Sequence, residues 1–211
     1  MSPGPEFLRY FPELSAVQVA QYEALQALYE EWNAKINVIS RKDIDHLYEH
    51  HVQHSMAIAK YVDTNQLWTS GTTIVDVGCG GGFPGIPLAI RYPECQFLLV
   101  DRIGKKVRVA QEVASAIGLQ NVSFRHAGIE EVKERFDYAV SRAVMLLPDL
   151  VKLVQRCTGK GLLTLKGGDL FDELNHRNCK GTVIVPIKCY FEEEFFETKN
   201  VLFTPFDQKK R

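Results

Sequence analysis

A short apolar run that passes directly into closely spaced glycines constrains this chain more than any other feature. Residues 74–77 read Ile-Val-Asp-Val, and their β-branched side chains predict a buried strand. Gly78, Gly80 and Gly82 follow at once, and glycine allows a backbone to turn sharply and to approach a ligand closely. Residues 86–90 then predict a helix. Strand, glycine turn and helix in this order are typical of a nucleotide-binding βα unit.

The turn is poorly suited to the pyrophosphate of a dinucleotide. Phe83 stands where the dinucleotide fingerprint places its third glycine. Pro84 and Pro87 remove two N–H donors from the helix N-terminus, where a pyrophosphate would bind. A ligand without phosphate, whose amino-acid part lies over the glycines, fits better, and S-adenosylmethionine is such a ligand. Asp76 could accept hydrogen bonds from the ammonium group of that ligand or from amides of the turn.

A second acidic residue supports a nucleoside ligand. Asp101 ends the next apolar run, residues 96–100, which predicts the second strand. Ligands of doubly wound sheets bind outside the carboxyl ends of the strands, where a carboxylate can accept hydrogen bonds from both ribose hydroxyls. NAD and S-adenosylmethionine both contain such a ribose, so Asp101 does not distinguish between the two cofactors. A cap for the helix that begins near Gly104 is a second, compatible role.

Composition limits the class of protein. The chain has 211 residues, of which 45% are hydrophobic and 24% charged, so we expect one globular unit with a sizeable core. Its net charge of −1 shows no bulk attraction to nucleic acid. The five cysteines form no C-x-x-C pair, which favours reduced thiols and a cytoplasmic protein. No apolar run approaches the ~18 residues of a membrane span, and we expect a monomer.

Residues 1–70 predict a helical cap that precedes the nucleotide-binding domain of residues 71–211. Apolar side chains recur at helical spacing over residues 14–32, and Asp43 can cap a second helix that runs to about Val62. The cap holds five Lys and Arg against nine Asp and Glu, so we do not expect it to grip RNA by charge.

Histidines recur on the second helix of the cap. His46, His50 and His54 are spaced by four residues and share one face. Two histidines four residues apart on a helix can ligate zinc. No third ligand is evident in the sequence, and Glu49 is not placed as in H-E-x-x-H. We therefore expect no metal, and favour a hydrogen-bonded helix face that lines the ligand cleft.

The remainder of the chain alternates between strands and helices. The expected helices are 105–117 and 146–157, and the expected strands are 122–124, 136–140, 161–165, 182–187 and 195–203. The short link before the last strand favours an antiparallel pair. The predicted fold is an α/β, Rossmann-like, seven-stranded and mostly parallel sheet with an antiparallel C-terminal pair, as in class I S-adenosylmethionine-dependent methyltransferases.

Six motifs in a fixed order make the chain more specific. They are Asn37–Ser40 with Asp43, Asp76–Ala89, Asp101 with Gly104–Val107, Ile129–Glu131, Ser141–Ala143 and Leu165–Gly167. The string Gly-Phe-Pro-Gly-Ile-Pro at residues 82–87 is far more specific than a general glycine motif. Together, over about residues 33–170, they resemble the bacterial RsmG family (also called GidB), methyltransferases that act on a guanine N7 of small-subunit ribosomal RNA.

The resemblance implies S-adenosylmethionine as cofactor and 16S ribosomal RNA, or the small ribosomal subunit, as partner. It implies that Gly78 and Phe83 contact the cofactor, that Ile129 and Glu130 lie beside its adenine, and that Arg142 lies between cofactor and substrate. The cofactor residues expected in all are Asp76, Gly78, Gly80, Phe83, Asp101, Ile129, Glu130 and Arg142. One departure is His54, which stands where the family often carries an aspartate.

Guanine N7 carries a lone pair and no proton, so its methylation requires no general base. The protein would then act by alignment of the reacting atoms, which can contribute roughly 7–11 kcal/mol. No Ser-His-Asp or Cys-His constellation is visible, and no residue is certain to be catalytic. Arg142 is the candidate for positioning; its alternative role is an ion pair with Asp137 or Glu130.

Ribosomal RNA requires a positive surface. The candidates are Arg102, Lys105, Lys106, Arg108 and Lys166, to which Arg142 and the terminal Lys209–Arg211 can add. A solvated helix face is the alternative for the group at 102–108. Three other functions stay open for the whole chain: a small-molecule methyltransferase, an NAD(P)-dependent oxidoreductase, and a cofactor-binding RNA module without catalysis.

Overall fold

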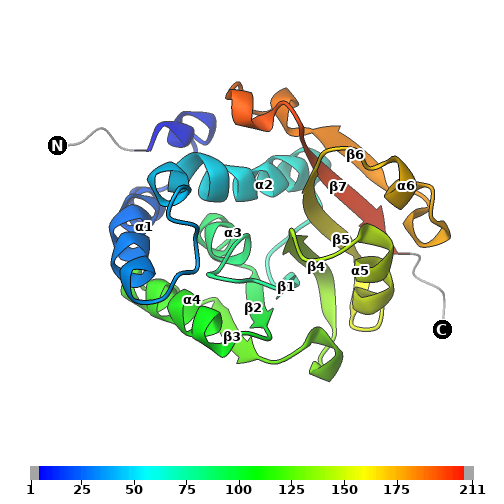
Figure 1. Cartoon of the computed structure of the whole chain (residues 1–211), viewed down its shortest axis with the longest axis horizontal. Coiled ribbons are helices and arrows are strands. Elements are labelled where there is room, and N and C mark those ends of the chain that lie inside the picture. The colour runs from blue at the N-terminus through cyan, green and yellow to red at the C-terminus, as the bar shows by residue number, and fades with distance from the viewer. Residues whose placement is uncertain (1–4, 207–211) are drawn as a thin grey trace.

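A seven-stranded sheet forms the centre of the molecule (Figure 1). The computed structural model describes residues 5–206, so the expected RNA contact at Lys209–Arg211 lies outside the described residues. The strands are β1 (Thr73–Val77), β2 (Gln96–Asp101), β3 (Val122–His126), β4 (Phe136–Arg142), β5 (Thr158–Gly167), β6 (Val183–Pro186) and β7 (Lys199–Pro205). Their order in the sheet is β3-β2-β1-β4-β5-β7-β6. The first five pair in parallel, and β7 is antiparallel to both β5 and β6, which confirms the predicted fold class.

The two faces of the sheet are covered by different helices (Figure 1). The first group comprises α1 (Ala16–Lys35), α2 (His54–Asn65), α3 (Gly85–Arg91) and α4 (Gly104–Ala116). The second comprises α5 (Leu147–Val154) and α6 (Phe171–Leu174). Successive side chains of β1 alternate between the two cores, since Ile74 packs with the first group and Val75 with the second.

The strand order reverses direction between β1 and β4. The chain runs outward from β1 through β2 to β3, and then returns to pair β4 with the other edge of β1. Ligands of open α/β sheets bind at such a switch point, beyond the carboxyl ends of the strands. The glycine turn leaves β1 at this point, and Arg142 ends β4 beside it.

The second half of the cap is not one continuous α-helix as predicted. A 3-10 turn (Ile44–His46) leads into a π-helix (Leu47–Gln53), and regular α-helix begins only at His54. A π-helix shifts the hydrogen-bond partners of its backbone, and such segments often occur at functional sites. Here the carbonyl of His50 accepts a hydrogen bond from Arg142, and that of His51 accepts one from the Ser55 hydroxyl.

The C-terminal boundaries also differ from the prediction. Residues 195–198 precede β7, and Glu194–Phe196 form a 3-10 turn. Phe196 is fully buried against Phe191, so aromatic residues that suggested a strand serve the core of a turn instead. The helix expected over 146–157 ends at Val154, and β5 begins at Thr158.

Within residues 5–206, no helix combines the length and the apolar character that a membrane crossing requires.

Candidate functional site

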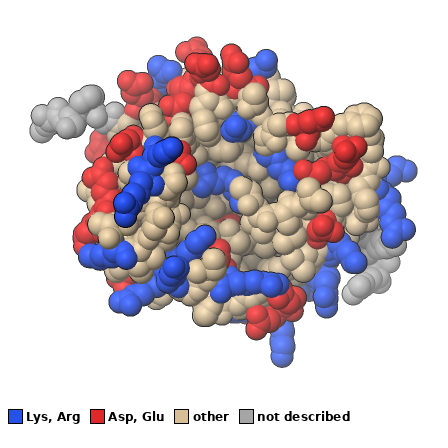
Figure 2. Space-filling model, in the orientation of Figure 1, with Lys and Arg blue, Asp and Glu red and all other residues tan. Residues whose placement is uncertain are grey.

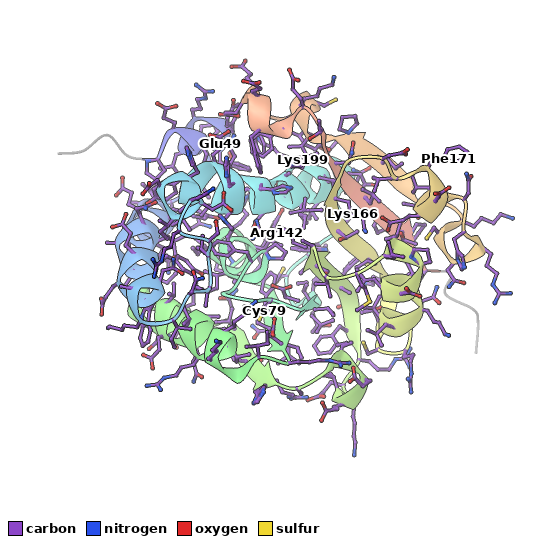
Figure 3. The ribbon with its side chains drawn as sticks, viewed as in Figure 1. Glu49, Cys79, Arg142, Lys166, Phe171 and Lys199 are labelled. Atoms are coloured by element: carbon purple, nitrogen blue, oxygen red, sulfur yellow. The ribbon has the colours of Figure 1, made fainter. Side chains whose placement is uncertain are left out.

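A cavity of about 680 Å³ opens at the switch point of the sheet. One wall is the turn after β1, with Gly78, Gly80 and Phe83, and the opposite wall is the π-helix of the cap. Figure 2 shows lysine and arginine atoms in and around this central hollow, while many acidic groups lie nearer the periphery of the same face. Figure 3 places Arg142 at the centre, between Cys79 of the turn and the side chains of Lys166 and Lys199.

The glycine turn is shaped to leave room for a ligand. Gly80 has a φ of +55°, and a Cβ added to it would meet no atom within 4 Å. Gly82 has a φ of +111°, and its Cβ would come within 2.4 Å of the Ile86 side chain. Glycine is therefore required at 82 for packing of the helix that follows, while the open space at Gly80 is a cradle that fits the amino-acid part of S-adenosylmethionine.

Two carboxylates, the buried Asp76 and the half-buried Asp101, accept hydrogen bonds from backbone N–H groups in and beside this turn. Asp76 accepts a hydrogen bond of 2.8 Å from the Gly85 N–H, and Asp101 accepts bonds of 2.8 Å from the N–H groups of Gly80 and Ile103. Burial raises the pKa of Asp76 to about 7. Neither carboxylate lines the cavity. The expected contact of Asp76 with turn amides is therefore observed, and contacts of either residue with the cofactor stay predictions.

The expected adenine side of the site lies apart from the cavity. Ile129 is buried, and Glu130 makes an ion pair of 2.6 Å with Arg102 at the surface. Val144, in the segment after β4, packs so closely on Gly78 that a Cβ there would lie 2.6 Å from its side chain. The cavity thus reaches Gly78 but not Ile129 or Glu130.

Arg142 joins the sheet to the cap. Its Nη1 donates to the His50 carbonyl at 2.9 Å, and its Nη2 lies 2.8 Å from Nδ1 of His51. Its guanidinium carbon lies 5.4 Å from the centre of the Phe83 ring. Burial lowers the pKa of Arg142 to about 10, so the group stays charged at neutral pH.

The alternative role of Arg142 as an ion-pair partner is not observed. Asp137 pairs instead with Lys160 at 2.9 Å, and Glu130 pairs with Arg102. The arginine is held by a carbonyl and an imidazole at the centre of the pocket, and among residues 5–206 no carboxylate forms an ion pair with it.

Two histidines of the predicted face, His50 and His54, line the cavity, whereas His46 does not line it. His50, His51 and His54 all border it, and His50 bonds Asp43 at 2.9 Å and stacks 4.0 Å from the Phe195 ring. Burial, with Arg142 adding to it, lowers the pKa of His51 to about 3 and that of His54 well below its usual value. Both rings are neutral at physiological pH, and Nε2 of each is buried without a hydrogen-bond partner in the described part of the chain.

No third ligand was expected near the histidines, but Glu49 lies beside two of them. One carboxylate oxygen of Glu49 and one ring nitrogen each of His46 and His50 all lie within 4.8 Å of one another. The His46 and His50 rings are stacked at 4.8 Å. The prediction that the protein binds no metal is not tested by this geometry.

Tyr29 was not recognised from the sequence. It lies on α1, is fully buried, and donates a hydrogen bond of 2.7 Å from its hydroxyl to the Gly81 carbonyl. Its ring centre lies 4.9 Å from that of Phe83. Only its place in the apolar helical pattern marked it, and that pattern does not show which buried tyrosine reaches a turn 52 residues away.

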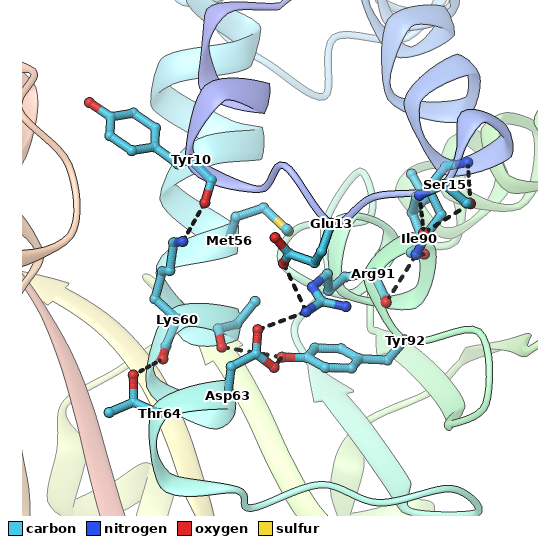
Figure 4. Close-up of polar contacts among 12 residues, drawn as sticks. Tyr10, Glu13, Ser15, Met56, Lys60, Asp63, Thr64, Ile90, Arg91 and Tyr92 are labelled. Atoms are coloured by element: carbon cyan, nitrogen blue, oxygen red, sulfur yellow. Dashed lines mark hydrogen bonds and ion pairs between the residues drawn. The ribbon is translucent and has the colours of Figure 1, made fainter.

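The cap that carries Tyr29 is tied to α3 by polar contacts (Figure 4). Arg91, at the end of α3, pairs with Glu13 at 3.0 Å and with Asp63 at 2.9 Å. Asp63 also accepts a hydrogen bond of 2.7 Å from Tyr92, and within the cap itself Lys60 donates to the Tyr10 carbonyl. These contacts fix the cap over the glycine turn.

The expected RNA-binding cations divide into two groups. Lys105 and Arg108 are exposed on α4, and Lys106 lines the cavity. Arg102 is paired with Glu130, and Lys166 pairs with Glu173 at 2.7 Å and donates to the Met145 carbonyl.

Lys199 was not among the cations expected from the sequence. It lines the cavity, and its Nζ lies 5.0 Å from the Phe195 ring centre.

Comparison with known proteins gives a consistent assignment. Residues 18–194 match the model of a family described as rRNA small subunit methyltransferase G. A relative named Ribosomal RNA small subunit methyltransferase G, from Bacteroides thetaiotaomicron, is 56% identical over 93% of this chain and 97% of its own length. A relative of the same name from Flavobacterium psychrophilum is 49% identical over 97% of this chain and 99% of its own.

Solved structures share the fold at low sequence identity. Magnesium protoporphyrin IX methyltransferase from Synechocystis, with bound S-adenosylmethionine, aligns with a TM-score of 0.61 and 13% identity over 92% of this chain and 99% of its own. An rRNA methylase from Streptococcus thermophilus aligns with a TM-score of 0.52 and 14% identity over 72% of this chain and 97% of its own.

Proposed function

Because the chain belongs to the rRNA small subunit methyltransferase G family, we propose that it transfers a methyl group from S-adenosylmethionine to N7 of one guanosine in 16S ribosomal RNA. Family membership and fold agree with the enzyme class and the cofactor expected from the sequence. They do not favour the oxidoreductase or small-molecule alternatives, since relatives of this name match the chain over nearly its whole length.

The choice of N7 is supported by the pocket, because several of its ionisable side chains are poorly suited to accept a proton. Among the described residues that line the cavity, Asp43 is the only carboxylate, and it is held by His50 and Ser40. The His51 imidazole has a pKa of about 3, and burial raises the pKa of the Cys79 thiol well above its usual value. General bases work best when their pKa is near the operating pH, so none of these groups is suited to deprotonate a hydroxyl. Guanine N7 needs no such step.

The residues present fit the cofactor. When bound, S-adenosylmethionine supplies an electrophilic methyl group. Gly78, Gly80 and Phe83 would hold its amino-acid side at the turn. Arg142 would border it and the substrate from the end of β4. The chain's own contribution is to orient the guanine and to exclude water, which can be worth roughly 7–11 kcal/mol.

Asp101, Ile129 and Glu130 would hold the adenosine side of the cofactor, with Asp76 supporting the turn. These four residues lie next to the turn or on the adjoining segments but outside the cavity, and Val144 packs on Gly78 between β1 and the segment after β4.

The partner is the small ribosomal subunit, and the cations around the pocket would contact its phosphates. Lys105, Lys106 and Arg108 are the first candidates, since Arg102 and Lys166 are already neutralised by glutamates. We further infer that the protein works in the cytoplasm as a monomer. The cap of residues 1–70 then completes the pocket formed on residues 71–211.

Methyl transfer to ribosomal particles tests the proposal. Small subunits from cells that lack this protein would be incubated with labelled S-adenosylmethionine, and the label mapped by nuclease digestion. We expect 7-methylguanosine at a single position of 16S RNA. Label on a ribose oxygen, on another base, or only on small molecules would refute the proposed reaction.

A further inference from the structure

His51 presents a buried N–H group for which the described residues offer no acceptor. Its Nδ1 lies 2.8 Å from Nη2 of Arg142, and a guanidinium can only donate hydrogen bonds. Nδ1 must therefore carry the lone pair, and the neutral ring carries its proton on Nε2. That Nε2 is buried and unpartnered. An unsatisfied buried donor is unfavourable, and its presence at a pocket wall indicates that a ligand supplies the acceptor.

The proposed target has an acceptor in the required place. Guanine and adenine both carry N7 as an acceptor on the edge that faces the major groove. Next to N7, guanine has the acceptor O6 and adenine has the donor amino group N6. An enzyme that methylates guanine N7 can therefore reject adenine with one fixed donor directed at position 6.

Three other donors of the pocket are less suited to this task. Arg142 already directs one N–H of each Nη group at His50 and His51, and Lys166 is paired with Glu173. His54 also has an unpartnered Nε2, but its ring is packed edge-on against Phe195 and Phe196. The His51 ring instead lies 5.2 Å from Phe83, on the wall of the cofactor turn.

We propose that Nε2–H of His51 donates a hydrogen bond to O6 of the target guanine and so selects guanine against adenine. The inference rests on the proposed function. In this arrangement Arg142 is a positioning residue for His51, because its hydrogen bond fixes which nitrogen carries the proton. The pKa of His51, lowered to about 3 by burial and by Arg142, keeps this donor form present throughout the physiological range.

Two substitutions separate the two nitrogens. In His51→Asn, the amide oxygen lies near the former Nδ1 and can still accept from Arg142, while no donor reaches the Nε2 position. In His51→Gln, the longer amide can place a donor near the Nε2 position but offers Arg142 no acceptor at Nδ1. The substrates are reconstituted small subunits whose 16S RNA carries either guanosine or 2,6-diaminopurine riboside at the target, since the latter keeps N7 and replaces O6 by an amino group.

We expect the wild-type protein to prefer guanosine strongly. For His51→Asn, kcat/KM on guanosine should fall by about 5- to 150-fold, the range of one specific base contact, while the value on 2,6-diaminopurine changes less than about 3-fold. The ratio of the two values then falls by the same factor. His51→Gln should keep the ratio within about 3-fold of wild type, even if both rates fall.

Several results would overturn the inference. The first is a wild-type protein with equal kcat/KM on guanosine and on 2,6-diaminopurine. The second is a His51→Asn variant in which the ratio of these two values is the same as in wild type. The third is a large fall of this ratio in His51→Gln alone, or in His54→Gln instead of His51→Asn. A wild-type protein that methylates no guanosine would refute the proposed function itself. Nitrogen-15 NMR of the histidines gives a check that needs no variant to fold: we expect His51 protonated on Nε2, and a proton on Nδ1 would refute the proposal.

Discussion

Arg142 and His51 are joined by a hydrogen bond of 2.8 Å, which links the end of β4 to the π-helical segment of the cap. The same guanidinium donates to the His50 carbonyl, so one side chain aligns two elements that are about 90 residues apart in the sequence. The shape of the pocket depends on this bridge.

Arg142→Lys should therefore be nearly as damaging as Arg142→Ala. A lysine keeps the positive charge but lacks the planar fork that reaches two acceptors at once. We expect kcat/KM for methyl transfer to small subunits to fall by roughly 100-fold in both variants, as is usual when reacting groups are misplaced by about 1 Å. Arg125 lies on β3 and forms an exposed ion pair with Glu134, so Arg125→Ala is the control and should retain activity. Full activity of Arg142→Lys would mean that charge alone suffices.

Asp76 should make the stability of the cofactor-free protein depend on pH. Its pKa is raised by burial from 3.8 to about 7, so the folded state holds this proton more tightly than the unfolded state. The contribution of Asp76 to stability should therefore be largest near pH 4 and below, fall as pH rises to about 7, and then level off. Asp76→Asn removes this loss, and its advantage over wild type should grow by up to roughly 4 kcal/mol between pH 4 and pH 8. Urea unfolding at several pH values measures it.

Asp137→Asn is a control for which we expect the opposite dependence of stability on pH. Burial opposes its charged form, but hydrogen bonds from Thr73 and Lys160 outweigh burial and lower the pKa of Asp137. A depressed pKa stabilises the folded state above the unfolded-state pKa, so this variant should lose stability at neutral pH and recover relative to wild type in acid. A pH-independent difference between Asp76→Asn and wild type would contradict the prediction for Asp76.

Tyr29→Phe should weaken cofactor binding through the turn. Removal of the hydroxyl leaves the buried Gly81 carbonyl without the donor at 2.7 Å, at a cost of about 1–3 kcal/mol in unfolding free energy. We expect the affinity for S-adenosylhomocysteine, measured by calorimetry, to fall several-fold. Tyr48→Phe, whose hydroxyl bonds the Tyr22 and Glu23 carbonyls outside the pocket, should lose stability but bind the cofactor product normally. Equal affinities in the two variants would refute the link between cap and turn.

Lys105 should contribute to RNA binding by charge. The affinity for small subunits should fall with salt, and Lys105→Ala should reduce the slope of log affinity against log salt by about 1. Lys152→Ala is the matched control, because Lys152 is also exposed but lies on α5, across the sheet from α4. Identical slopes in the two variants would assign Lys105 to an ordinary solvated surface.

The sequence identified those parts of the site that are local in the chain. The strand, turn and helix of residues 74–90 were predicted because β-branched residues, glycines and prolines act within a few positions. The parts that it missed depend on tertiary contacts. Tyr29 reaches the glycine turn and Lys199 reaches the pocket wall from distant elements, and nothing in their neighbours along the chain signals it.

The ion pairing of Lys166 and the helix type of residues Leu47–Gln53 were also not predicted from the sequence. Lys166 was expected to be available to RNA, but Glu173 reaches it across the segment that follows β5. The π-helix of Leu47–Gln53 has an apolar pattern close to that of an α-helix, so periodicity alone did not distinguish them.

The position of β7 has a consequence for how the protein is made. This strand lies between β5 and β6, although it follows both along the chain. A sheet that formed before β7 was available would have an unpaired β5 edge, and an unpaired edge can recruit a strand from another molecule. Synthesis of Lys199–Pro205 closes that edge and adds Lys199 to the pocket wall in the same step. A pause in translation before this point would leave a nascent chain that is prone to aggregate and has an incomplete pocket.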